Sequence, residues 1–131
     1  MCGFVGFTGQ YDNKAELIAR MSERIVHRGP DMAGEYCDDD IALGFRRLSI
    51  LDLSDNGRQP MTSIDGRYII AYNGEIYNFL ELRRGLEERG VHFASRCDTE
   101  VLLSAYREYG EDIVHKLRGM YVFAIWDKHE K

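Results

Sequence analysis

The sequence predicts an α+β domain in which antiparallel strands and amphipathic helices share one core. Two turn signals support this class: the acidic turn at 38–40 separates two strand-like segments, and Asp65-Gly66 is typical of a hairpin. Segments with apolar residues at helical spacing lie between the strands. With 131 residues, 44% of them hydrophobic, the chain is long enough to form one domain with a real core.

The first half of the chain is predicted to contain a strand, a helix and a hairpin. An apolar strand with small glycines should end near Thr8-Gly9, and Asp12-Asn13 offers an N-cap to a helix that runs to about residue 25. Gly29-Pro30 should end that region. Residues 35–37 and 41–45 should pair around the acidic turn. The helical spacing predicts an inward face made of Leu17, Ile18, Met21 and Ile25.

The second half is predicted to contain two strands that are apolar on both faces, with helices between them. Residues 68–72 form the first, which the segment 73–75 should close. A helix capped by Asn78 and stopped by Gly90, a second from Asp98 to Gly110, and a short helical turn should follow. The first helix contains Leu80, Leu82 and Leu86, the second should turn Leu102, Ala105, Tyr106 and Tyr109 inward, and the helical turn carries Ile113, Val114 and Leu117.

The segment 120–126 is the last predicted strand. Because it is apolar on both faces, we expect both to be covered and both of its edges to be paired. Only five residues follow it. We therefore expect the chain to be a truncated domain whose missing part would supply the neighbouring strand.

Composition excludes several classes of function. The net charge of −5, without a basic block, argues against a nucleic-acid or anionic-membrane surface. No apolar run reaches membrane-spanning length and no signal peptide is recognisable. The three cysteines and four histidines lack zinc-ligand spacing, so Cys37 and Cys97 are expected to be buried small hydrophobes, and a reducing cytoplasm is the expected compartment.

Cys2 is the candidate nucleophile. Removal of Met1 would leave a cysteine that carries both a thiol and a free α-amine. A thiol reacts as thiolate and needs a nearby base, and an α-amine, whose pKa is ordinarily about 7.7–8.0, can accept the proton near neutrality. Such a residue needs no histidine partner, so we interpret His27 as structural. The alternative is that Cys2 is an N-terminal cysteine without a role.

Asn73 and Gly74 are the candidate oxyanion hole. Attack on a carbonyl needs two donors where negative charge develops, and the Asn73 side-chain NH₂ and the unshielded Gly74 backbone N–H fit this need. The alternative is an ordinary Asn-Gly turn. A helix rather than a second strand is predicted to follow, which makes a simple hairpin turn less favoured.

Arg47 and Asp98 are candidates for gripping a free amino-acid substrate. Arg47 can bind a carboxylate through two parallel hydrogen bonds, and Asp98 can accept from an ammonium group. The alternatives are a solvated surface arginine and a helix N-cap.

Six ordered motifs, taken together, resemble the class II glutamine amidotransferases, and most closely their branch that forms the glutaminase half of glutamine-hydrolysing asparagine synthetases. The resemblance spans essentially the whole chain, 1–131. Relatives that serve phosphoribosyl pyrophosphate or fructose-6-phosphate share the Cys-Gly start but differ in several of the other motifs. The motifs are Met1-Cys2-Gly3, the segment 27–31 (HRGPD), the segment 47–50 (RLSI), Gln59-Pro60, the segment 73–78 (NGEIYN) and Asp98-Thr99-Glu100.

The resemblance implies an Ntn-hydrolase fold, an αββα sandwich of two antiparallel sheets with outer helices. It also implies that Cys2 attacks the side-chain amide of glutamine through a thioester, with Asn73 and Gly74 as the oxyanion hole. Arg47 would hold the α-carboxylate and Asp98 the α-ammonium. Backbone groups of Leu48, Ser49, Ile50, Leu51 and Glu75 would complete the pocket.

In this family a second domain uses ATP and magnesium to make asparagine from aspartate, and we expect that domain to be absent here. We expect no cofactor in the fragment itself. Two alternatives stay open. One is a non-catalytic fragment, an incompletely folded or dimerising module that binds glutamine weakly or not at all, which the apolar final strand motivates. The other is an amidotransferase domain that serves a sugar or peptide acceptor.

Overall fold

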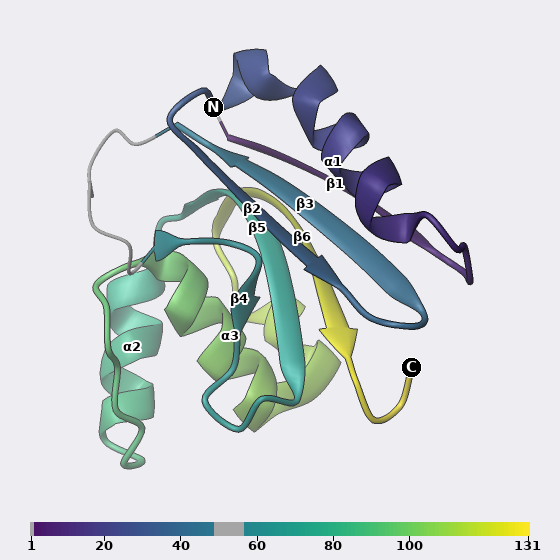
Figure 1. The fold of residues 1–131 in the computed structure, drawn as a ribbon. Coiled ribbons are helices and arrows are strands. Elements are labelled where there is room, and N and C mark those ends of the chain that lie inside the picture. The colour runs from purple at the N-terminus through teal and green to yellow at the C-terminus, as the bar shows by residue number, and fades with distance from the viewer. Residues whose placement is uncertain (1, 49–56) are drawn as a thin grey trace.

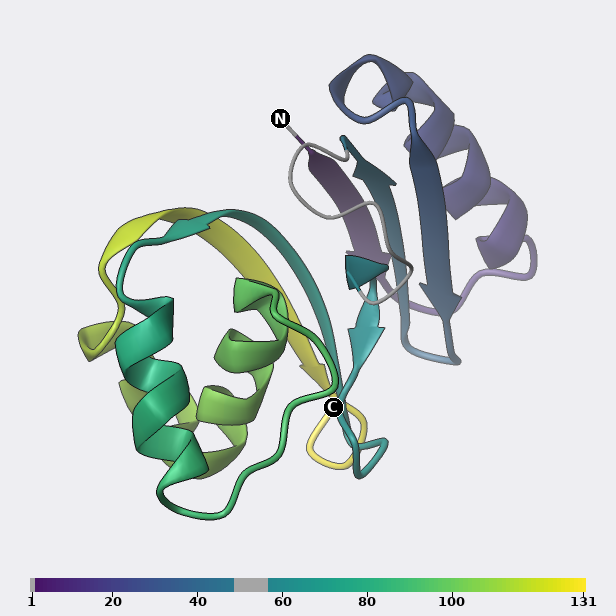
Figure 2. The ribbon, with the colours of Figure 1, turned by 90° about the vertical axis from the view of Figure 1, so that its left-hand side faces the viewer.

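The computed structural model describes residues 2–48 and 57–131, which form four layers (Figures 1 and 2). Two three-stranded sheets pack face to face, α1 covers the outer face of one, and α2 and α3 cover the outer face of the other. The expected α+β sandwich of two antiparallel sheets is confirmed. In chain order the elements are β1 Gly3–Thr8, α1 Lys14–Arg24, the 3-10 helix η1 Val26–Arg28, β2 Met32–Cys37, β3 Ile41–Arg47, β4 Met61–Thr62, β5 Tyr68–Ile76, α2 Phe79–Glu87, α3 Asp98–Tyr109, the 3-10 helix η3 Gly110–His115 and β6 Gly119–Asp127.

The first sheet has the order β1-β3-β2 and is antiparallel throughout. Gly3 pairs with Arg46 across β1 and β3, and Cys37 pairs with Ala42 across the predicted acidic turn. Since β1 begins where β3 ends, Cys2 lies beside the end of β3 at Arg47. The sheet therefore brings residue 2 next to a residue 45 positions away in the sequence.

The second sheet has the order β4-β5-β6, and β5 pairs with β6 from Tyr68↔Asp127 to Ile76↔Gly119. Strand β5 extends four residues beyond its predicted end, so Asn73 and Gly74 lie in a strand and the interpretation as a turn is wrong. Gly74 has a φ of +154°, and a Cβ there would collide with the carbonyl oxygen of Met120. Only glycine fits this position without strain.

The core has two parts. The larger lies between β5, β6 and the helices, and its fully buried members include Ile70, Leu102 and Ile113. A smaller cluster between the sheets contains Ile41, Leu43 and Ile69, with Tyr36 and Trp126 packed against it. Burial of these apolar side chains is the main force that holds the two sheets together.

Asp38 reinforces the contact between the sheets. Its carboxylate accepts hydrogen bonds from Trp126 Nε1 on β6 (2.7 Å) and from the Tyr36 hydroxyl (2.9 Å). The backbone N–H groups of Asp40 and Ile41 donate to its other oxygen, each at 2.9 Å. Burial opposes ionisation, but the four donors outweigh it and lower the pKa of Asp38.

Several side chains depart from their predicted environment. Leu80 is 62% exposed and Val114 is 45% exposed, although both are among the apolar residues of their predicted helices. Each lies at the edge of its helical face, where spacing alone does not separate inward from outward positions. The interior side of α1 includes Lys14 and Ser22 beside Ile18. Lys14 can be buried there because its ammonium donates to backbone carbonyls of Asp38 and Asp39 (2.9 and 2.6 Å).

Strand β6 is covered on one face only along its first half. Tyr121 and Phe123 pack against the helical core, whereas Met120 and Val122 are 73% and 54% exposed. The expectation that both faces are covered is therefore wrong for these two positions. Cys37, expected to be buried, is exposed on β2. No described helix combines the length and apolar character needed to cross a membrane.

Asp38→Asn should lower the free energy of unfolding by about 1–3 kcal/mol at pH 7, because its amide NH₂ would face backbone donors that now bind a carboxylate. Since the folded-state pKa lies below the unfolded value of about 3.9, this stabilisation is present above that pH and is lost as the pH falls through the folded pKa. Urea unfolding of both proteins from pH 7 to pH 2.5 should show the difference shrinking. Asp39→Asn, an exposed neighbour with the same charge change, is the control; an equal loss in both variants would contradict the role of Asp38.

Candidate active site

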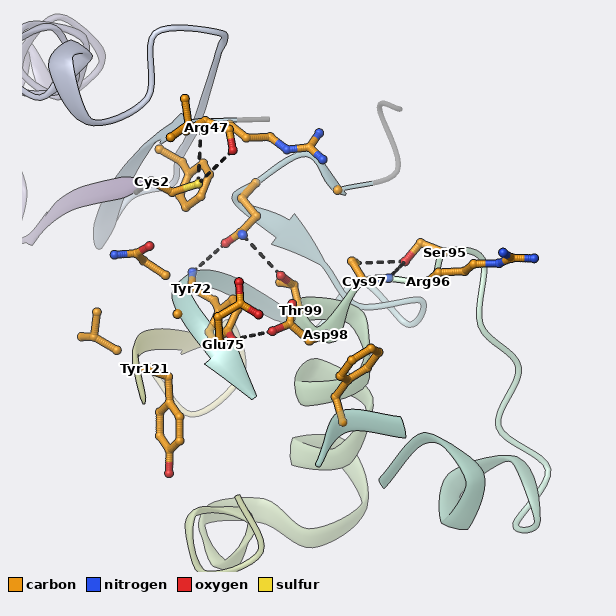
Figure 3. A pocket seen from close by; sticks show the side chains of 18 of the residues that line it. Cys2, Arg47, Tyr72, Glu75, Ser95, Arg96, Cys97, Asp98, Thr99 and Tyr121 are labelled. Carbon is orange, nitrogen blue, oxygen red and sulfur yellow. Dashed lines mark hydrogen bonds between the residues drawn. The ribbon is translucent and has the colours of Figure 1, made fainter. Parts of the chain in front are cut away.

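A cavity of about 1110 Å³ opens where β1, β3, β5 and β6 meet the start of α3. Figure 3 shows Cys2 and Arg47 on one side of this cavity and Tyr72, Glu75 and Asp98 on the other. Of the predicted site residues, the structure brings together Cys2, Arg47, Leu48, Asn73, Gly74, Glu75 and Asp98. Ser49, Ile50 and Leu51 lie outside the described residues.

Cys2 is held by three hydrogen bonds. The backbone N–H of Leu48 donates to the sulfur (3.3 Å), and the thiol faces the Leu48 carbonyl (3.7 Å). Arg28 Nε donates to the Cys2 carbonyl (3.1 Å). Both the side chain and the backbone of Cys2 are thus fixed, and the sulfur lies at the cavity surface.

The segment 27–31 acts through Arg28 rather than through His27, which is exposed. Gly29 lets the segment approach β3, because a Cβ there would collide with the backbone of Arg46 and Arg47. The Asp31 N–H then donates to the Arg47 carbonyl (3.1 Å). Gly29 is therefore needed for the segment 27–31 to pack closely against β3. The sequence did not indicate that Arg28 would reach Cys2.

Arg47 occupies the end of β3, partly buried, with its guanidinium against Gly57. A Cβ at position 57 would lie 2.8 Å from Arg47 Nη2. The glycine therefore provides the room in which the guanidinium lies. From this position at the cavity, the Arg47 guanidinium can bind a carboxylate through two parallel hydrogen bonds.

Asn73, Gly74 and Glu75 supply the facing wall. Asn73 pairs with Val122 and Glu75 with Met120, so these four side chains share the face of β5 and β6 that is turned toward the first sheet. Among the described residues, the Asn73 side-chain amide has no hydrogen-bond partner, which leaves its N–H groups available to a ligand.

Asp98 is the first residue of α3, and Cys97 occupies the N-cap position. The interpretation of Asp98 as a helix N-cap is therefore wrong. Its Oδ2 instead accepts hydrogen bonds from the Tyr72 hydroxyl (2.6 Å) and from the Ile76 N–H (3.3 Å), so the carboxylate turns toward β5 and the cavity (Figure 3).

Three polar cavity residues, Gln59, Tyr72 and Thr99, were missed at the sequence level. Gln59, 7% exposed, accepts from the Tyr72 N–H (2.6 Å) through Oε1 and donates to the Thr99 hydroxyl (3.3 Å) through Nε2. It joins β5 to the start of α3. Burial, followed by the hydrogen bond to Asp98, strongly raises the pKa of Tyr72, which therefore stays a donor. The Gln59-Pro60 motif was noted in the sequence, but nothing in its pattern indicated burial.

The segment before α3 forms the outer wall. Glu100 accepts hydrogen bonds from the backbone N–H groups of Ala94 and Ser95 (2.8 and 2.7 Å), and Arg83 donates to the Ser95 carbonyl (2.7 Å) while lying over the Phe93 ring.

Within residues 2–48 and 57–131, no group of three His, Cys, Asp or Glu side chains is arranged to hold a metal ion.

The chain is similar to known proteins over its whole length. The family model described as "Glutamine amidotransferase domain" matches residues 1–131. The chain is 49% identical over 135 residues to asparagine synthetase [glutamine-hydrolyzing] 1 of Bacillus subtilis, covering 99% of this chain and 21% of that protein. It is 40% identical to asparagine synthetase [glutamine-hydrolyzing] 3 of the same organism, covering 98% and 22%.

A solved structure, glutamine phosphoribosylpyrophosphate amidotransferase from B. subtilis in complex with ADP and GMP, superposes with a TM-score of 0.80. It shares 21% identity and covers 97% of this chain and 35% of its own. This likeness supports the Ntn-hydrolase sandwich as the fold. The chain spans about a fifth of the length of its curated relatives. With its whole length matched by the family model, the chain belongs to the glutamine amidotransferase domain family.

Proposed function

We propose that this domain hydrolyses glutamine to glutamate and ammonia, with Cys2 as an N-terminal nucleophile. The observation that carries the proposal is that one cavity is lined by Cys2, by the donors of Asn73 and Gly74, and by the opposite charges of Arg47 and Asp98. These are the groups that amide hydrolysis of a free amino acid needs. Family membership supports glutamine as the substrate.

The reaction follows from the chemistry of a terminal cysteine. Met1 must first be removed, because an acylated nitrogen accepts no proton. The α-amine of Cys2 then takes the thiol proton, and the sulfur attacks the glutamine Cδ carbonyl to form a C–S bond. Asn73 and Gly74 stabilise the resulting oxyanion. The C–N bond breaks, the proton passes to the departing ammonia, and water hydrolyses the γ-glutamyl thioester to release glutamate and restore the thiol.

Substrate selection rests on the two charged groups. Arg47 binds the α-carboxylate through two parallel hydrogen bonds, Asp98 binds the α-ammonium, and backbone groups of Leu48 and Glu75 complete the described part of the pocket. A substrate lacking either charge leaves a partly buried partner uncompensated, which disfavours its binding.

For the longer protein to which this domain corresponds, we infer a cytoplasmic ligase that transfers the ammonia to aspartate. The names of the relatives support this acceptor. ATP and magnesium would bind in the part of such a protein that lies outside this domain. A sugar or peptide acceptor is the alternative, since the acceptor site is not among the residues of this chain.

Cys2→Ala should abolish glutamate release from glutamine in protein from which Met1 has been removed, because the substitution removes the thiol that we propose forms the thioester. The melting temperature should stay within about 2 °C of wild type, since the substitution keeps the backbone carbonyl that accepts from Arg28. Intact mass confirms the removal of Met1, and a coupled glutamate dehydrogenase assay measures turnover. The control is Cys37→Ala, which removes an exposed thiol and should keep full activity. Residual turnover in Cys2→Ala would remove Cys2 from the mechanism.

Arg47→Ala should raise KM for glutamine roughly 30-fold or more, because losing one member of a desolvated charge pair costs about 2 kcal/mol or more. The same steady-state assay measures KM, and Arg24→Ala on the exposed end of α1 is the charge-matched control. An unchanged KM in Arg47→Ala would show that Arg47 does not contact the substrate.

A further inference from the structure

The Tyr72 hydroxyl donates a short hydrogen bond of 2.6 Å to Asp98, and both residues line the cavity. Tyr72 is 3% exposed and is anchored at its backbone as well, because its N–H donates to the buried Gln59. The phenol therefore has little freedom to move. The Tyr72 hydroxyl therefore determines the orientation of the Asp98 carboxylate.

Asp98 uses only one of its oxygens in the described structure. Oδ2 accepts both the Tyr72 hydroxyl and the Ile76 N–H, whereas Oδ1 has no hydrogen-bond partner among the described residues. An aspartate at the start of a helix would otherwise turn toward the free N–H groups of the first turn, where a carboxylate is stabilised. The Tyr72 hydroxyl holds Asp98 away from that alternative.

We propose that Tyr72 is a positioning residue that presents Asp98 Oδ1 to the α-ammonium of the substrate and so sets the preference for a free α-amino acid. The inference rests on the proposed function, in which Asp98 binds that ammonium. Gln59 extends the network, because it ties the Tyr72 backbone to Thr99, the neighbour of Asp98 on α3. Gln59 thereby fixes the Tyr72 phenol and the start of α3 relative to each other.

The test is Tyr72→Phe, which removes the hydroxyl and keeps the ring in the core. Dissociation constants are measured by calorimetry in a Cys2→Ala background, where no turnover consumes the ligand. The two ligands are L-glutamine and 4-carbamoylbutanoate, which lacks only the α-amino group. Tyr72→Phe should weaken L-glutamine roughly tenfold and leave the des-amino analogue unchanged, because a bond to a charged group is lost only from the ammonium site.

Tyr68→Phe is the matched control. It removes a phenol from the same face of β5, four residues earlier, whose hydroxyl has no hydrogen-bond partner among the described residues, and it should change neither constant. Tyr72→Phe should also have no further effect when added to Asp98→Asn, since both changes act on one contact.

An equal loss for both ligands in Tyr72→Phe would overturn the inference, since it would indicate a general packing role. An unchanged affinity for L-glutamine would overturn it as well. Because the readout is binding, either failure is separate from that of the proposed function, which is judged by glutamate release in protein with Cys2 intact.

Discussion

The packing of the two sheets against each other positions both halves of the candidate site. Cys2 and Arg47 come from the first sheet, whereas Asn73, Gly74 and Asp98 come from the second sheet and the helix that covers it. Neither sheet contains a complete site. The apolar cluster around Ile69 and the hydrogen bonds of Asp38 therefore do more than stabilise the fold, since they set the distance between the two halves of the cavity.

In the half of the site formed by the second sheet and α3, hydrogen bonds hold together residues that are distant in the sequence. Gln59, Tyr72 and Asp98 come from three separate segments, and each fixes the next through a bond of defined direction. On the opposite side, Leu48 and Arg28 do the same for Cys2. Side chains positioned by such partners keep a fixed geometry before any ligand arrives, which lowers the cost of binding and of reaching the transition state.

Most helices and strands could be predicted from local patterns, whereas the two-sheet sandwich and the substrate roles of the site residues came from the resemblance to the family. Hairpin signals, helical spacing and glycine stops locate the elements, and Asn73-Gly74 stands out from an ordinary turn because a helix follows it. The errors arose where a side chain's environment depends on distant segments. Leu80 has helical spacing but lies at the margin of its helix face, and Met120 and Val122 are exposed although they lie on the face of β6 that is turned toward the first sheet. Arg28 and Tyr72 were missed because their partners are 26 residues away in the sequence in each case.

Covalent trapping would show whether the sulfur of Cys2 is the nucleophile of this cavity. Protein freed of Met1 would be incubated with a glutamine analogue that carries an electrophilic carbon in place of the amide nitrogen, then digested and mapped by mass spectrometry. We expect one adduct, on Cys2, whose formation is suppressed by excess L-glutamine. Labelling of Cys37 or Cys97 instead, or labelling of Cys2 that L-glutamine does not suppress, would contradict it.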